Sequence, residues 1–104
     1  MNRHSTLALA AAILAIPLAA TAPAQAASSS FYRAELASPL AEPRREVLGG
    51  VVWQCEGSSC TGTKSGSRPV IVCERLAQNV GPVSSFAHPG GALDARAIAR
   101  CNGE

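Results

Sequence analysis

The sequence contains little charge and few aromatic side chains. Only 15% of its 104 residues are charged and 4% are aromatic, and nine Lys and Arg nearly balance seven Asp and Glu. Proteins that bind nucleic acid or an anionic membrane surface usually carry a basic stripe, and this sequence has none. We therefore expect no nucleic-acid partner.

Residues typical of catalytic centres are also scarce. Beyond the N-terminal region the sequence has one histidine, His88, and one aspartate, Asp94. A Ser-His-Asp triad would need both, but His88 lies in a His-Pro-Gly-Gly turn pattern with no nucleophile-elbow motif nearby. Glycine-rich phosphate loops, zinc-binding H-E-x-x-H helices and calcium loops are absent from the sequence. These absences favour a non-enzymatic protein without a cofactor.

No apolar run is long enough to span a bilayer, but residues 1–26 have the pattern of a cleavable signal peptide. Arg3 precedes an uncharged run over 7–20, and Ala-Gln-Ala follows at 24–26. This order of basic, apolar and small residues marks an exported protein. The run is shorter than the roughly 20 residues of a membrane span, and Pro17 interrupts it. We expect cleavage after residue 26, no membrane insertion of the mature chain, and a periplasmic or secreted location.

Four cysteines lie in the remaining part of the chain, at Cys55, Cys60, Cys73 and Cys101. An even number in a short exported chain predicts a disulfide framework, which a domain of this size usually needs for stability. Three pairings are compatible with the count. The turn-forming Glu-Gly-Ser-Ser segment favours a bond between Cys55 and Cys60. Cys73 and Cys101 each fall on the apolar side of an expected helix, which favours a bond between them.

The cysteines also allow two other interpretations. Redox sites favour two cysteines separated by two residues at a helix N-terminus, whereas four residues separate Cys55 from Cys60. The intervening segments of 4, 12 and 27 residues match no zinc-ribbon pattern. We therefore expect structural disulfides and no metal, and we keep a thiol-disulfide redox role as an alternative.

Strand patterns occupy the first half of the mature chain. After a disordered stub at 27–30, residues 32–36 alternate apolar and charged side chains, as in a half-buried strand. The proline-containing segment 38–45 is expected to be a loop. A second strand is expected over 47–55, with Gly49 and Gly50 as a bulge or bend. Segment 57–67 is expected to be an exposed, mobile loop, apart from a short return strand near Cys60.

Helical spacing follows in the second half. Ser67 is expected to cap a helix that has Pro69 in its first turn and ends at Gly81. The β-branched residues at 69–73 leave a strand as the rival interpretation. A third strand is expected at 83–87 and a turn at 88–91. A second helix, with Asp94 near its start and Cys101 on its apolar side, ends at 102–103.

The predicted fold is a single α+β domain over residues 27–104. An antiparallel sheet of two to four strands has two short helices on one face, and disulfides stabilise the whole. We find no internal repeat and no second domain in the sequence.

The pattern from Trp53 onward resembles a family of small exported alphaproteobacterial proteins of unknown function. The resemblance covers residues 50–102. It depends on Trp53-Gln54-Cys55-Glu56-Gly57-Ser58-Ser59-Cys60, Cys73 with Leu76-Ala77, Gly81-Pro82-Val83 with Phe86, and Cys101-Asn102. The resemblance implies export and a cysteine framework, and it implies no activity, substrate or catalytic residue.

The leading functional hypothesis is a non-enzymatic binding or envelope-associated module that binds an unidentified protein or envelope component. An exposed apolar patch around Trp53 or Phe86 would form its binding surface, although a tryptophan beside a disulfide cysteine is more often part of the core. The alternatives are the thiol-disulfide role and a small secreted hydrolase inhibitor that inserts segment 57–67 into its target. The sequence leaves the oligomeric state open.

Overall fold

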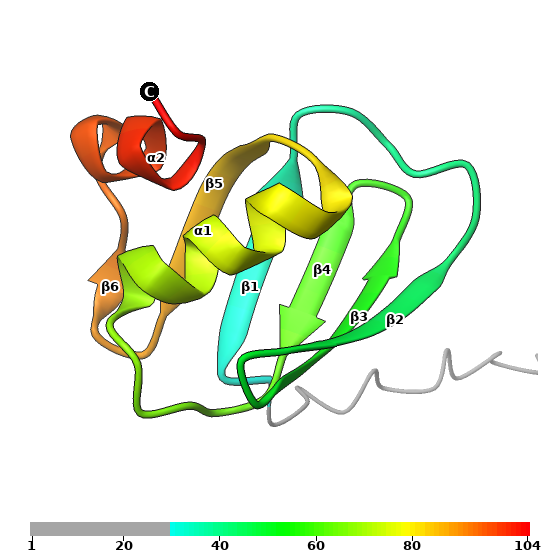
Figure 1. The fold of residues 1–104 in the computed structure, drawn as a ribbon, viewed down its shortest axis with the longest axis horizontal. Helices are drawn as coiled ribbons and strands as arrows, with labels where there is room; N and C mark the ends of the chain where they lie inside the picture. The colour runs from blue at the N-terminus through cyan, green and yellow to red at the C-terminus, as the bar shows by residue number, and fades with distance from the viewer. Residues whose placement is uncertain (1–29) are drawn as a thin grey trace, which may run out of the picture.

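The computed structural model describes residues 30–104. The signal peptide expected at 1–26, and the expected stub except for Ser30, lie outside the described residues. An antiparallel sheet with two helices forms the described part (Figure 1). In chain order the elements are β1 (Tyr32–Leu36), β2 (Arg44–Leu48), β3 (Val51–Glu56), β4 (Ser59–Gly62), α1 (Pro69–Val80), β5 (Val83–His88), β6 (Gly91–Ala92) and α2 (Ala95–Cys101).

The sheet is larger than the two to four strands expected. Six strands lie in the order β2-β3-β4-β1-β5-β6, and every neighbouring pair is antiparallel. The expected strand over 47–55 is two strands, because Gly49 and Gly50 both have positive φ, 55° and 81°. Two such residues form the tight turn that reverses a hairpin. The expected loop at 38–45 therefore stops where Arg44 begins β2.

A second hairpin replaces most of the mobile loop expected at 57–67. Gly57, with φ 60°, turns the chain so that β4 pairs with β3 and then with β1. The expected return strand near Cys60 is thus confirmed as β4, a central strand of the sheet. Residues 63–68 connect this strand to α1.

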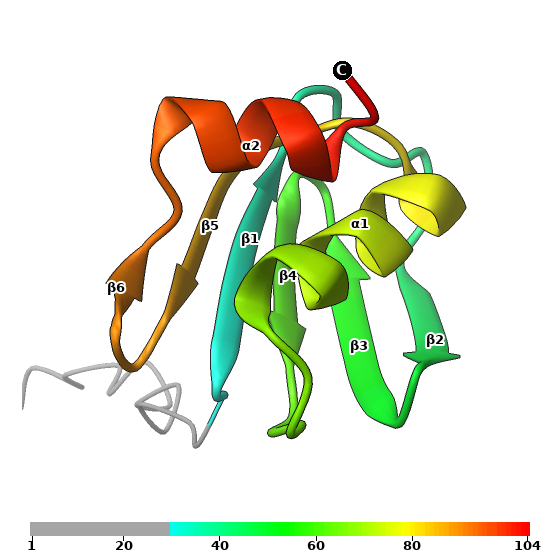
Figure 2. The same cartoon turned by 60° about the vertical axis from the view of Figure 1, so that its left-hand side comes forward.

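Both helices lie on the same face of the sheet, as predicted (Figure 2). The helical interpretation of 69–80 is confirmed, and the rival strand at 69–73 is wrong. Arg68 occupies the N-cap position instead of Ser67 and makes no side-chain capping bond, while Ser67 Oγ accepts a hydrogen bond from Arg75. Asp94 caps α2 by accepting a bond from the Ala97 N–H at 2.8 Å. Among the described residues, no helix has the length and apolar character needed to cross a membrane.

The hydrophobic core fills the space between the sheet and the helices. Alternation along β1 and β3 points every second side chain into this space. The core consists of Tyr32, Ala34, Leu36, Val51, Trp53, Cys55, Cys60, Val72, Cys73, Leu76, Val80, Val83, Phe86 and Cys101. One face of the sheet is therefore apolar and covered by helices. The opposite face, called the open face below, is left without a helix (Figure 2).

Candidate functional site

The open face carries a row of polar side chains across four strands. Arg45 on β2 pairs with Gln54 on β3, which pairs with Thr61 on β4, which pairs with Arg33 on β1. All four residues are exposed. Because paired residues on neighbouring strands point to the same side of a sheet, their side chains form one continuous polar row.

Two hollows meet on this row. One, of about 450 Å³, is lined by Pro43, Arg44, Arg45, Gln54, Cys55, Glu56, Ser59 and Thr61. The other, of about 230 Å³, is lined by Ser30, Arg45, Val52, Gln54, Thr61, Gly62 and Thr63. Arg45, Gln54 and Thr61 line both hollows, so they lie at the centre of the candidate surface.

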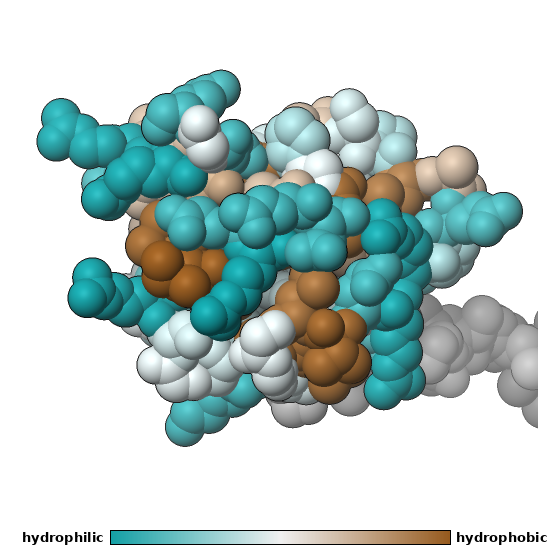
Figure 3. All heavy atoms as spheres, in the orientation of Figure 1, coloured by the Kyte–Doolittle hydropathy of each residue, from teal (hydrophilic) through white to brown (hydrophobic). Residues whose placement is uncertain are grey.

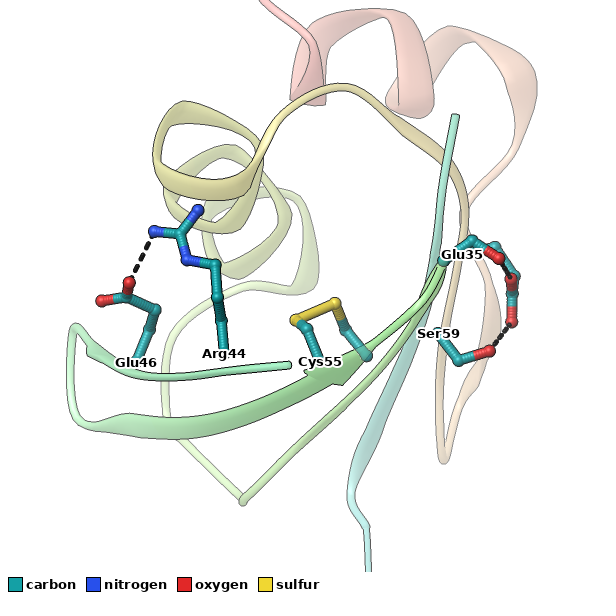
Figure 4. The surroundings of a disulfide bond; sticks show 7 residues. Glu35, Arg44, Glu46, Cys55 and Ser59 are labelled. Atoms are coloured by element: carbon teal, nitrogen blue, oxygen red, sulfur yellow. Dashed lines mark hydrogen bonds and ion pairs between the residues drawn. A yellow bond between two sulfur atoms is a disulfide. The ribbon is translucent and has the colours of Figure 1, made fainter. Parts of the chain in front are cut away.

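The charged side chains near these hollows differ in whether they have an ion-pair or hydrogen-bond partner. Arg44 and Glu46 form an ion pair of 2.6 Å (Figure 4). Glu35 accepts hydrogen bonds from Ser59 Oγ at 2.8 Å and Ser58 Oγ at 3.2 Å. Arg45 has no side-chain hydrogen bond or ion pair within residues 30–104. Its guanidinium is therefore available to an acidic group of another molecule.

Trp53 and Phe86, the residues of the expected binding surface, both have their side chains in the core. They are 0% and 1% exposed, and their ring centroids lie 6.1 Å apart. Tyr32 joins them on the covered face of the sheet, with its centroid 5.6 Å from that of Phe86. The core interpretation of Trp53 is thus the correct one.

Within residues 30–104, Trp53 and Phe86 are buried and form no exposed apolar patch. Figure 3 shows a largely hydrophilic surface with small, separated hydrophobic areas on the side where α1 lies in front of the sheet. Among the large hydrophobic side chains of residues 30–104, only Val47 is exposed, with 65% of its surface accessible. Val47 lies on β2, two positions from Arg45.

The structure confirms both favoured disulfides, Cys55–Cys60 and Cys73–Cys101. The first joins directly opposite residues of β3 and β4, with Cα atoms 4.1 Å apart. The second ties α1 to α2, as their apolar faces predicted. All four cysteines are at most 2% exposed. The disulfides therefore lie within the framework of the domain.

The two residues considered for a hydrolytic triad have local structural contacts. His88 Nδ1 accepts a hydrogen bond from the Gly90 N–H at 3.2 Å, in the turn between β5 and β6. Asp94 is the N-cap of α2. Within the described part of the chain, no group of three or more His, Cys, Asp or Glu residues is placed to hold a metal ion.

Sequence reasoning missed the polar row and the exposed position of Val47. The loop expected at 38–45 includes Arg45, and the longer strand expected at 47–55 starts at Val47. The Gly49-Gly50 pair was the available signal, since two consecutive glycines suit a hairpin turn as well as a bulge. The hairpin interpretation would have placed Arg45 and Val47 on a separate strand.

The comparison with protein families gives one match. The family model described as "Family of unknown function (DUF8200)" matches residues 14–103, which include both disulfides. No curated protein and no solved structure matches the chain. The family match confirms that the chain resembles a family of unknown function. Export and the taxonomic range stay predictions. The chain belongs to DUF8200, a family of unknown function.

Proposed function

We propose that this protein is a non-enzymatic binding module of the periplasm or the extracellular space, and that it binds its partner through the open face of the sheet. The observation that carries this proposal is the pair of hollows that meet at Arg45, Gln54 and Thr61. Helices cover the opposite face, so the open face is the broad sheet surface available to a partner.

The lining of the hollows favours a macromolecular partner. Small-molecule sites are typically concave and mostly apolar, with a few polar groups that fix the ligand. Here both hollows lie open on a sheet surface, with arginine, glutamine, glutamate, serine and threonine among the lining residues. A protein or another envelope component can cover such a surface and satisfy many polar groups at once.

The compartment follows from the cysteines. Two disulfides in a small domain indicate an oxidising, extracytoplasmic location, because cytosolic thiols are kept reduced. Together with the signal peptide expected at 1–26, this supports a periplasmic or secreted protein. Mass spectrometry of the protein from its native compartment should find Ala27 as the N-terminus and no thiol that alkylates without reductant.

The structure favours neither alternative function. A thiol-disulfide role needs an accessible reactive pair, whereas all four cysteines are bonded and at most 2% exposed. A hydrolase inhibitor of the type considered would present segment 57–67 as a protruding loop. Four of its residues instead form β4, between β3 and β1.

Site-specific crosslinking in the producing cells tests the proposed surface. A photoreactive amino acid replaces Thr61 on the open face or, as a control, the exposed Gln78 on α1. We expect a discrete adduct from position 61, absent from position 78 and reduced when Arg33→Glu reverses a charge in the same row. Adducts at position 78 only, or none at either position, would reject the open face as the binding surface.

A further inference from the structure

The two edges of the sheet are protected differently. At one edge, β6 pairs with the end of β5, and the Asn102 side chain bonds both backbone groups of Val83, at 2.8 Å each. At the other edge, the sheet ends at β2, and no described strand or helix lies beyond it (Figure 1). An unpaired strand edge offers N–H and C=O groups to another chain.

The hydrogen bonds of Val52 establish which groups of β2 point outward. Its N–H donates to Thr63 Oγ1 at 2.9 Å, and its C=O accepts from the Thr63 N–H at 3.2 Å. The backbone groups of Val52 therefore point toward β4, so Val47, opposite Val52 on β2, is in a non-bonded pair. Since bonded and non-bonded pairs alternate along an antiparallel ladder, Arg45 is in the same position. The N–H and C=O groups of both residues point away from the sheet.

The side chains of Arg45 and Val47 are also open to contact with another molecule. Arg45 has no ion pair within residues 30–104, and Val47 is 65% exposed. By contrast, Arg44 and Glu46, on the other face of β2, neutralise each other (Figure 4). The free edge thus combines outward backbone groups with one unpaired cation and one exposed apolar side chain, two positions apart.

We infer that β2 is a docking edge for one extended segment of a protein partner, which adds to the sheet as a further strand. The segment carries an acidic residue opposite Arg45 and, two positions away, an apolar residue opposite Val47. Main-chain hydrogen bonds supply affinity in this mode of recognition, and alternate side chains supply specificity. The inference rests on the proposed binding function and names the class of partner.

A second copy of this chain fits the edge poorly. Symmetric antiparallel pairing of two β2 strands centred on Glu46 places the two Glu46 carboxylates opposite each other. Pairing centred on Arg45 places the two Arg45 guanidinium groups opposite each other. Like charges directly opposite each other destabilise a strand pair. Pairing centred on Val47 leaves Arg45 opposite Gly49, without an acidic partner. The charge pattern therefore favours a different protein.

A synthetic peptide serves as the probe. It has seven residues with blocked ends, threonine at most positions, and a valine followed two positions later by an aspartate, so that antiparallel addition places them against Val47 and Arg45. We expect it to bind the oxidised protein and to slow amide hydrogen exchange at Arg45 and Val47, as followed by NMR. A peptide with N-methylated valine and aspartate should not bind, because the main-chain bonds are lost.

Charge reversal gives the decisive comparison. Arg45→Glu should weaken binding about tenfold or more, and a peptide with lysine in place of the aspartate should then bind this variant better than the unaltered protein. Arg96→Glu, at an exposed position of α2 and outside the polar row, is the control and should change affinity much less. Circular dichroism checks that each variant is folded.

Three results would overturn the inference. The NMR signals of Arg45 and Val47 could show no change in position or exchange rate at millimolar peptide, the N-methylated peptide could bind equally well, or the protein could self-associate through β2. Crosslinks from position 61 without peptide binding at β2 would leave the proposed function standing and reject the docking edge. Protection of β2 by the peptide without crosslinks from position 61 would keep the docking edge and reject the open face.

Discussion

At the scale of single residues, Gly62 shows how closely the sheet packs against its buried tryptophan. A Cβ at this position would lie 2.9 Å from two ring carbons of Trp53 and from Val51 Cγ1. Trp53 is 0% exposed, so its ring is enclosed by the core. Gly62→Ala should therefore lower the free energy of unfolding by about 1–3 kcal/mol, as overpacked cores do.

Denaturant unfolding followed by Trp53 fluorescence measures this change. Gly66→Ala is the control, because no atom lies within 4 Å of its added Cβ and its φ is not positive. This variant should have nearly unchanged stability. Equal stability of the two variants would show that the sheet relaxes around Gly62.

Asn102 is a second residue whose side chain stabilises the sheet, through two hydrogen bonds to the backbone of Val83. Its Oδ1 accepts a hydrogen bond from the Val83 N–H and its Nδ2 donates one to the Val83 C=O. Asn102→Ala leaves both backbone groups without these partners and should cost about 1–3 kcal/mol of unfolding free energy. Asn79→Ala, which removes one exposed bond to the Arg75 C=O, should change little in the same denaturation experiment. A larger loss for Asn79 would contradict this assignment.

At the scale of elements, the two disulfides should contribute unequally. The Cys73–Cys101 bond spans a sequence separation of 28 residues, against 5 for Cys55–Cys60. On the loop-entropy model, replacing both cysteines by alanine should cost roughly 3.5 kcal/mol for the longer loop and roughly 2 kcal/mol for the shorter one. Urea unfolding of the two double variants measures the difference. A larger loss from the β3–β4 hairpin would show that strain or residual structure outweighs loop length.

The elements also show how far sequence patterns lead. The α1 stripe, the alternation of β1 and the place of Asp94 near the start of α2 are local signals, and the structure confirms all three. The division of 47–55 into two strands depends on the positive φ angles of Gly49 and Gly50. A pair of glycines is typical of a bulge as well as of a hairpin turn, so the sequence does not distinguish the two. The charged residues at the start of β2 resemble a loop in the sequence, although charges are common on edge strands.

The candidate surface was harder to predict than the fold. Large aromatics often anchor interfaces, which favours Trp53 and Phe86 as surface anchors, but a domain with so few aromatics uses them in its core. Arg45, Gln54, Thr61 and Arg33 come together only through strand order. That order requires β4 to lie between β3 and β1, which no local pattern in the sequence indicates.

At the scale of the whole molecule, folding should depend on the redox state. A domain of this size has a total stability of roughly 4–11 kcal/mol, and the two disulfides together supply roughly 5–6 kcal/mol on the loop-entropy model. Full reduction should therefore bring the folded and unfolded states close to balance. We expect reductant to abolish a large part of the far-ultraviolet circular dichroism and to make the chain sensitive to protease.

Reoxidation provides the control for this prediction, because it should restore the spectrum and re-form the two observed pairs. The variant without Cys55 and Cys60 should keep its fold in the absence of reductant, because the Cys73–Cys101 bond contributes the larger part of the stabilisation by disulfides. A reduced protein that retained its spectrum and its protease resistance would show that the core alone holds the sheet and helices together.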